Sequence, residues 1–95
     1  STFPAAKEDI ALVVDESVTA AQVEALIRAT AKDLAEEVRL FDVFRGEQLG
    51  EGRKSLAFSL RLRAADRTLT AEDTAGIRKR IVKRAAKALG AELRA

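Results

Sequence analysis

The chain has 95 residues, of which 47% are apolar and 34% charged, a balance ordinary for one small soluble domain. It contains no Cys and no His, which excludes disulfide frameworks, zinc sites, thiol nucleophiles and imidazole general bases. No apolar run is long enough for a membrane span or a secretory signal, so we expect a cytoplasmic protein. Because the chain also lacks Met, it is either trimmed behind its initiator or, as we expect, excised from something longer.

Acidic and basic residues are unevenly distributed. Residues 1–52 carry five Lys and Arg against eleven Asp and Glu, whereas residues 53–95 carry twelve against four. A basic second half is typical of a protein that binds a polyanion such as RNA. The alternative is that the two halves interleave in the fold and partly neutralise each other.

The first predicted element is a short strand over residues 9–15, DIALVVD, which is rich in β-branched residues. Ile10, Leu12 and Val14 form its larger apolar set and are expected to face a core. Ala11 and Val13 are left for the opposite face, where their small side chains leave room for a flat ligand.

A helix is predicted to begin at Thr19, because Thr19 and Gln22 have the spacing of a capping box. One apolar stripe follows at spacings of three and four residues: Val23, Leu26, Ile27, Thr30 and Leu34. We interpret the adjacent Glu36 and Glu37 as the solvated end of this helix and not as a catalytic pair, since neighbouring helix residues do not face each other.

Two strands are predicted next, over residues 38–45 and 54–63. The second alternates strictly, so that Leu56, Phe58, Leu60 and Leu62 face a core and Ser55, Ala57, Ser59, Arg61 and Arg63 line an open, polar and basic face. The loop GEQLGEGRKS between them is not a nucleotide-binding Walker loop, because Arg53 separates Gly52 from Lys54 and the loop leads into a strand.

A second helix is predicted from its cap at Thr70 to the terminating Gly90, followed by a final strand over residues 91–94. It carries six basic residues, Arg78, Lys79, Arg80, Lys83, Arg84 and Lys87. These cations either follow a phosphate backbone or form a solvated helix face on the back of the sheet.

The order strand, helix, strand, strand, helix, strand predicts an α+β fold, the ferredoxin-like βαββαβ sandwich with a four-stranded antiparallel sheet and two helices on one face. Right-handed crossovers place the first and third strands at the centre of the sheet. We expect residues 1–95 to form a single domain of this kind, and the fold by itself assigns no function.

Several segments, in order and over nearly the whole chain, resemble the ferredoxin-fold anticodon-binding domain at the C-terminus of the bacterial phenylalanyl-tRNA synthetase beta chain. The matching segments are FP at 3–4, DIALVVD at 9–15, FDVFRG at 41–46, GRKSLA at 52–57, TLT at 68–70 and GAELR at 90–94. The resemblance implies that the chain is the C-terminal fragment of a longer beta chain.

The resemblance also implies how RNA is bound. Phe44 is expected to stack on the first anticodon base on the open face, with Phe41 buried, Ala11 as the close-packed neighbour and Ser55 as a hydrogen-bonding group. The family prefers Tyr at the position of Phe44, and Arg where this chain has Glu8, so Lys7 is expected to supply that charge. The candidate RNA-binding residues are therefore Ala11, Phe44, Ser55, Ala57, Ser59, Arg61 and Lys7.

The function implied is that of a non-catalytic tRNA-binding accessory domain that grips the anticodon stem-loop of phenylalanine tRNA. Its parent would be an ATP-dependent phenylalanine–tRNA ligase that uses magnesium and assembles as alpha2-beta2; no cofactor or metal is expected in the domain itself. The alternative is a protein docking module that uses the open sheet face. A metal-binding or small-molecule regulatory domain has the least support, because the acidic residues do not cluster at coordination spacing.

Overall fold

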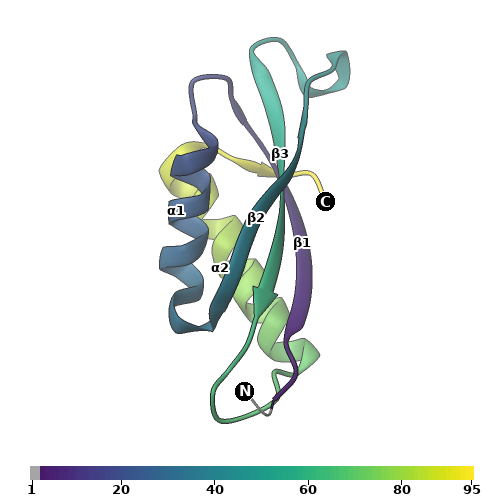
Figure 1. The fold of residues 1–95 in the computed structure, drawn as a ribbon. Helices are drawn as coiled ribbons and strands as arrows, with labels where there is room; N and C mark the ends of the chain where they lie inside the picture. Colours follow the sequence, from purple (N-terminus) through teal and green to yellow (C-terminus); the bar gives the residue numbers. More distant parts are fainter. Residues whose placement is uncertain (1–2) are drawn as a thin grey trace.

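The computed structural model describes residues 3–95 (Figure 1). Four strands and two α-helices follow one another in the order β1, α1, β2, β3, α2, β4, joined by loops that include short 3-10 turns at Lys32–Leu34 and Glu47–Leu49. They are β1 (Ala6–Asp15), α1 (Ala20–Ala31), β2 (Ala35–Phe44), β3 (Arg53–Leu62), α2 (Ala71–Leu89) and β4 (Glu92–Leu93).

The four strands form one antiparallel sheet in the order β2-β3-β1-β4, with β3 and β1 at its centre. Both helices lie on the same side of this sheet, and the other side carries no helix (Figure 1). We call the helix-free side the open face. The predicted ferredoxin-like α+β architecture is confirmed, including the central positions of the first and third strands.

Both predicted helix starts are confirmed. Thr19 and Gln22 form a complete capping box, as do Thr70 and Asp73, so each helix begins with backbone N–H groups bonded to side chains. Gly90 closes α2 in the left-handed conformation, with φ 64°.

The core lies between the helices and the sheet, and it confirms the predicted parity of β1 and β3. Phe58 and Leu12 are completely buried at 0% exposure. The core side chains include Ile10, Leu12 and Val14 of β1, Leu56, Phe58, Leu60 and Leu62 of β3, Val23 and Ile27 of α1, Val38 of β2, and Ile77, Ile81 and Ala85 of α2.

The predicted boundary between the first helix and the second strand was wrong. Glu36 and Glu37 do not end a helix; α1 stops at Ala31, a 3-10 turn reverses the chain, and both carboxylates lie at the start of β2. Glu36 pairs there with Arg63 at 3.1 Å. The local apolar spacing continued to Leu34 and so did not mark the turn, which depends on the unusual backbone of Lys32 (φ 55°).

Candidate nucleic-acid interface

The open face is organised in four transverse rows, because residues directly paired across antiparallel strands point to the same side of a sheet. Taken across β2, β3 and β1, the rows are as follows: row one is Phe44, Ser55 and Val13; row two is Asp42, Ala57 and Ala11; row three is Arg39, Ser59 and Asp9; row four is Glu37, Arg61 and Lys7. Ser55 and Arg61 are six positions apart on β3, which separates rows one and four by about 20 Å.

In row one, the side chain of Arg94 stacks on the ring of Phe44. The guanidinium carbon of Arg94 lies 4.5 Å from the centre of the Phe44 ring, within the range of a cation–π interaction. Beneath this level, Ser55 is only 2% exposed and Val13 only 8%, although no helix covers this side. Row one is therefore a platform whose uppermost groups are an aromatic ring and a cation.

The C-terminal segment positions Arg94. The N–H of Arg94 donates to Ala11 O at 2.8 Å, and the N–H of Ala11 donates to Ala95 O at 2.7 Å, which extends the pairing of β4 with β1. Arg53 strengthens this edge by binding Glu92 at 3.0 Å and Val13 O at 3.2 Å. Figure 1 shows the C-terminal end on the side of the sheet away from the helices.

Gly46 provides the space that the Phe44 ring occupies. A Cβ atom at Gly46 would lie 2.8 Å from Cζ of Phe44, closer than carbon atoms pack. The backbone of Gly46 is extended, with φ −173°, so no conformational reason demands glycine here. The reason that remains is contact with the Phe44 ring and with Oε1 of Gln48, which would lie 2.6 Å from the same Cβ.

The second aromatic residue of β2 differs from its prediction. Phe41 was expected to be buried, and it is 48% exposed. The register advances by two residues on β2 and by one on β3 between Leu40 and Asp42, so Phe41 is the extra residue of a β-bulge. The resemblance had implied that Phe41 is buried, and this expectation is wrong because the side chains of a strand do not keep a strict period of two through a bulge.

Charge gathers at the other end of the open face. Row four places Arg61 beside Lys7, with Glu37 on the outer strand. Glu8 has the opposite parity and lies 3.9 Å from Arg78 of α2, on the helix side. Its carboxylate is therefore away from the open face, and Lys7 is the residue of this pair that faces it.

A further cation near row one is already paired. Arg45, just after β2, binds Glu16 at 2.6 Å, and this hydrogen bond is the main reason that the pKa of Glu16 is lowered. The exposed pair ties the end of β2 to the loop after β1. Arg45 is therefore occupied by Glu16, whereas Arg94 lies directly over Phe44.

The predicted site residues divide into two groups. Phe44, Ser55, Ala57 and Ala11 lie together in rows one and two, whereas Ser59, Arg61 and Lys7 lie further along the face. Sequence reasoning missed the roles of Arg94 and Arg53. One signal was present, namely a basic residue directly after a short final strand that must pair with the first strand.

Comparison with known proteins decides the family. The sequence profile described as "Ferredoxin-fold anticodon binding domain" matches residues 1–94. The chain belongs to this family. The resemblance found in the sequence is confirmed.

Similar proteins show where such a domain occurs. The phenylalanine–tRNA ligase beta subunit of Thermobifida fusca is 61% identical over 94 residues, and those of Corynebacterium efficiens and Streptomyces avermitilis are 57% and 56% identical over 94 residues. Each match covers 99% of this chain and 11% of the relative. This member of the ferredoxin-fold anticodon-binding family therefore spans about a tenth of the length of those beta subunits.

Residues 3–95 lack two kinds of feature. No helix there is long and apolar enough to cross a membrane. Nor does this part of the chain gather three or more acidic side chains in a way that could hold a metal ion.

Proposed function

We propose that this chain grips the anticodon stem-loop of a phenylalanine tRNA through its open face, with Phe44 as the stacking residue for the first anticodon base. The observation that carries the proposal is row one: a half-buried aromatic ring on a helix-free sheet, in a member of an anticodon-binding family. Base–aromatic stacking contributes about 1–3 kcal/mol per base, which makes one ring a substantial part of such a site.

Arg94 must move when a base stacks on the ring face that it covers. A cation–π contact at an exposed site is worth about 0.5–1 kcal/mol, which is less than the stacking of a base. The base therefore displaces the guanidinium, and the freed cation is then available to a phosphate or a base edge. Ala11 and Ala57 in row two keep the surface beside the ring flat.

The electrostatics of the open face favour reading a base over attracting RNA from a distance. In the four rows and the Arg94 above them, four cations, Arg39, Arg61, Lys7 and Arg94, stand against three carboxylates, Asp9, Glu37 and Asp42, and the next pair along the same face, Arg53 and Asp15, adds one charge of each sign. With so small an excess of positive charge, we expect binding at this face to depend only modestly on salt concentration.

We infer that the chain is the C-terminal, non-catalytic domain of a cytoplasmic phenylalanine–tRNA ligase beta subunit that assembles as alpha2-beta2. ATP and magnesium would act in the catalytic part of that ligase, outside these 95 residues. The beta-subunit relatives support this assignment. Within a tethered assembly a weak contact is effective, because linkage raises its effective concentration.

The test is a titration of the chain, at two salt concentrations, with the phenylalanine-tRNA anticodon stem-loop and with a loop that differs only in the first anticodon base. We expect preference for the native loop. Phe44→Ala should weaken binding about tenfold and remove the preference, as loss of one stacked base requires. Phe41→Ala is the matched control, because Phe41 is an exposed aromatic on the same strand, and it should change neither quantity.

Two outcomes would overturn the anticodon-reading role. Unchanged affinity of Phe44→Ala would remove the stacking residue. Equal, strongly salt-dependent binding of both loops would mean that nonspecific phosphate contacts account for the affinity.

A second candidate function, a protein docking module, is favoured by two exposed apolar side chains on the edge strand β2, and so at this edge and not on the open face where the sequence had suggested it. Phe41 is 48% exposed and Val43 is 42% exposed. If this edge docks another domain or subunit, Phe41→Ser and Val43→Ser should weaken assembly of the ligase and leave stem-loop affinity unchanged. Normal assembly of both variants would reject this candidate.

A further inference from the structure

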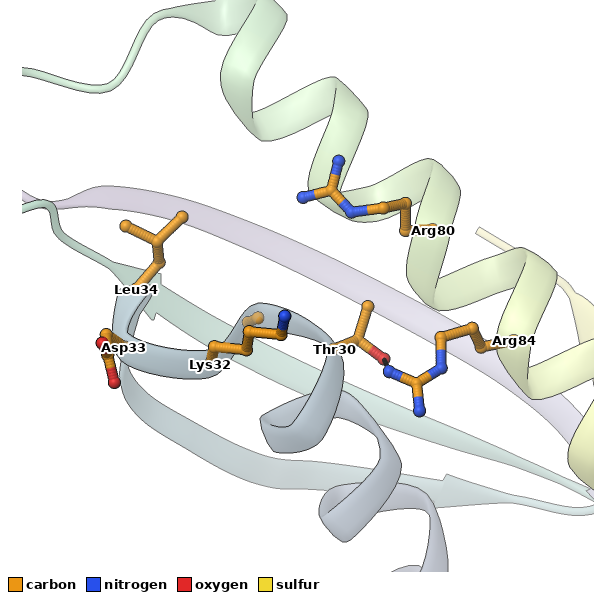
Figure 2. Close-up of a pocket in the computed structure, with 7 residues that line it drawn as sticks. Thr30, Lys32, Asp33, Leu34, Arg80 and Arg84 are labelled. Atoms are coloured by element: carbon orange, nitrogen blue, oxygen red, sulfur yellow. Dashed lines mark hydrogen bonds between the residues drawn. The ribbon is translucent and has the colours of Figure 1, made fainter.

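A pocket of about 530 Å³ lies on the helix side of the molecule, between the end of α1 and the middle of α2 (Figure 2). It is lined by Thr30, Ala31, Lys32, Asp33, Leu34, Arg80 and Arg84. The open face is on the other side of the sheet, so this pocket is separate from the proposed anticodon site.

Three exposed cations, Lys32, Arg80 and Arg84, line this pocket. Figure 2 shows Arg80 and Arg84 extending from α2 and Lys32 rising from the turn after α1, whereas the carboxylate of Asp33 points away from them. Within residues 3–95, Lys32, Arg80 and Arg84 form no ion pair. Arg78 on the same helix differs, because Glu8 lies 3.9 Å from it.

One of the three cations is held in place by a buried hydroxyl. Arg84 donates to Oγ1 of Thr30 at 3.0 Å, and the same hydroxyl donates to Leu26 O at 2.7 Å. Thr30 is only 6% exposed, so its position is fixed by packing. Arg has five N–H donors, and this contact uses one, which leaves a pre-positioned guanidinium able to bind an oxyanion.

The backbone of Lys32 is the second unusual feature. Its φ of 55° makes it the one residue other than glycine with a positive φ in the described part of the chain. Glycine adopts this conformation at lower cost, so the backbone alone gives no reason for lysine here. The ammonium group that lysine adds to a pocket also lined by Arg80 and Arg84 provides such a reason.

We propose that the pocket formed by Lys32, Arg80 and Arg84 binds a phosphate group, either a phosphodiester of a nucleic-acid backbone or free inorganic phosphate. Guanidinium groups bind phosphate through paired hydrogen bonds, and the ammonium adds a compact positive charge. This site does not rest on the proposed anticodon contact.

The test is an NMR titration of the chain, which has its own continuous core, with inorganic phosphate at constant ionic strength. Amide signals of residues 30–34 and the side-chain signals of Arg80 and Arg84 should shift and saturate. Arg84→Gln should weaken binding by about tenfold, the effect of losing charge-assisted hydrogen bonds. Lys32→Gly should also weaken binding, yet raise the unfolding temperature, because it removes the strained backbone.

Lys87→Gln is the matched control, since it removes one exposed cation from α2 outside the pocket, and it should leave the titration unchanged. Phe44→Ala should also leave it unchanged, which separates this site from the open face. Unsaturable shifts spread along α2, an equal loss in Lys87→Gln, or no pocket shifts with any probe would overturn the proposal.

A second arm with hexauridylate identifies the source of the phosphate. Pocket shifts that require hexauridylate would assign the site to a nucleic-acid backbone. Equal affinity for inorganic phosphate would assign it to the free anion.

Discussion

Arg94 and Phe44 are fifty positions apart in sequence and come from opposite edges of the sheet, yet the guanidinium carbon lies 4.5 Å from the ring centre. The contact spans the two central strands. It joins the C-terminal segment to the strand that carries the proposed stacking residue. A change in the position of the Phe44 ring should therefore change the environment of the Arg94 side chain.

This stack predicts a spectroscopic signature. The side-chain Nε–Hε signal of Arg94 should be displaced by the ring current of Phe44 in the free chain. Phe44→Leu keeps an apolar side chain and removes the ring, so the signal should return to an ordinary position, while Phe41→Leu should leave it in place. If the chemical shift of the Arg94 signal is the same in Phe44→Leu as in the unmodified chain, the stack is not populated in solution.

Gly46→Ala should disturb the stack without unfolding the chain. The added Cβ would meet Cζ of Phe44 at 2.8 Å and Oε1 of Gln48 at 2.6 Å, so the ring must shift. We expect a changed Arg94 signal, stem-loop affinity several-fold lower by titration, and a small change in unfolding free energy of about 1 kcal/mol or less. Gly52→Ala is not a suitable control, because φ at Gly52 is 74° and alanine would be strained there.

Two glycines of the α2 region should respond in opposite directions. Gly76 lies within α2, and a Cβ there would find only Arg80 Nη1 at 3.6 Å, so Gly76→Ala should stabilise the chain by about 0.5–1 kcal/mol. Gly90 ends α2 at φ 64°, so Gly90→Ala should destabilise it by about 1 kcal/mol. Urea unfolding measures the change in unfolding free energy of both variants. Destabilisation by both variants would contradict the packing space seen at Gly76.

Stability should fall on acidification, in part through the cap of α2. The N–H of Thr70 donates to the carboxylate of Asp73 at 2.9 Å, and this hydrogen bond holds the pKa of Asp73 below its ordinary 3.8. Since the folded pKa is the lower one, the unfolded chain binds more protons on acidification. The stabilisation is complete above the unfolded pKa and is lost as pH falls through the folded pKa.

The measurement is urea unfolding across a pH series from about 6 down to about 2. Asp73→Asn should flatten the acid limb of the profile, because Asn accepts the capping hydrogen bond without titrating. Asp66→Asn, in the exposed turn before α2, should leave the limb as it is. An identical acid limb in wild type and Asp73→Asn would assign the pH dependence to other carboxylates.

The amino-acid sequence by itself determined the elements whose signals are local. A capping box needs only residues three apart, so both helix starts were predicted correctly. The alternation from Ser55 to Arg63 needs only the two-residue period of a strand, and alternation in this way also predicted which side chains of β1 and β3 face the core. The family could also be recognised from the sequence, because its motifs are contiguous segments.

Tertiary structure alone decided the features that join distant parts of the chain. The bulge at Phe41 interrupts the two-residue period of β2. Glu8 forms an ion pair with Arg78 of α2, and Arg94 contacts Phe44 across the two central strands. The pocket likewise needs the turn at Lys32 to meet α2. Each depends on strand register and helix placement, which are set by the packing of the whole core and not by the spacing of residues along any one segment.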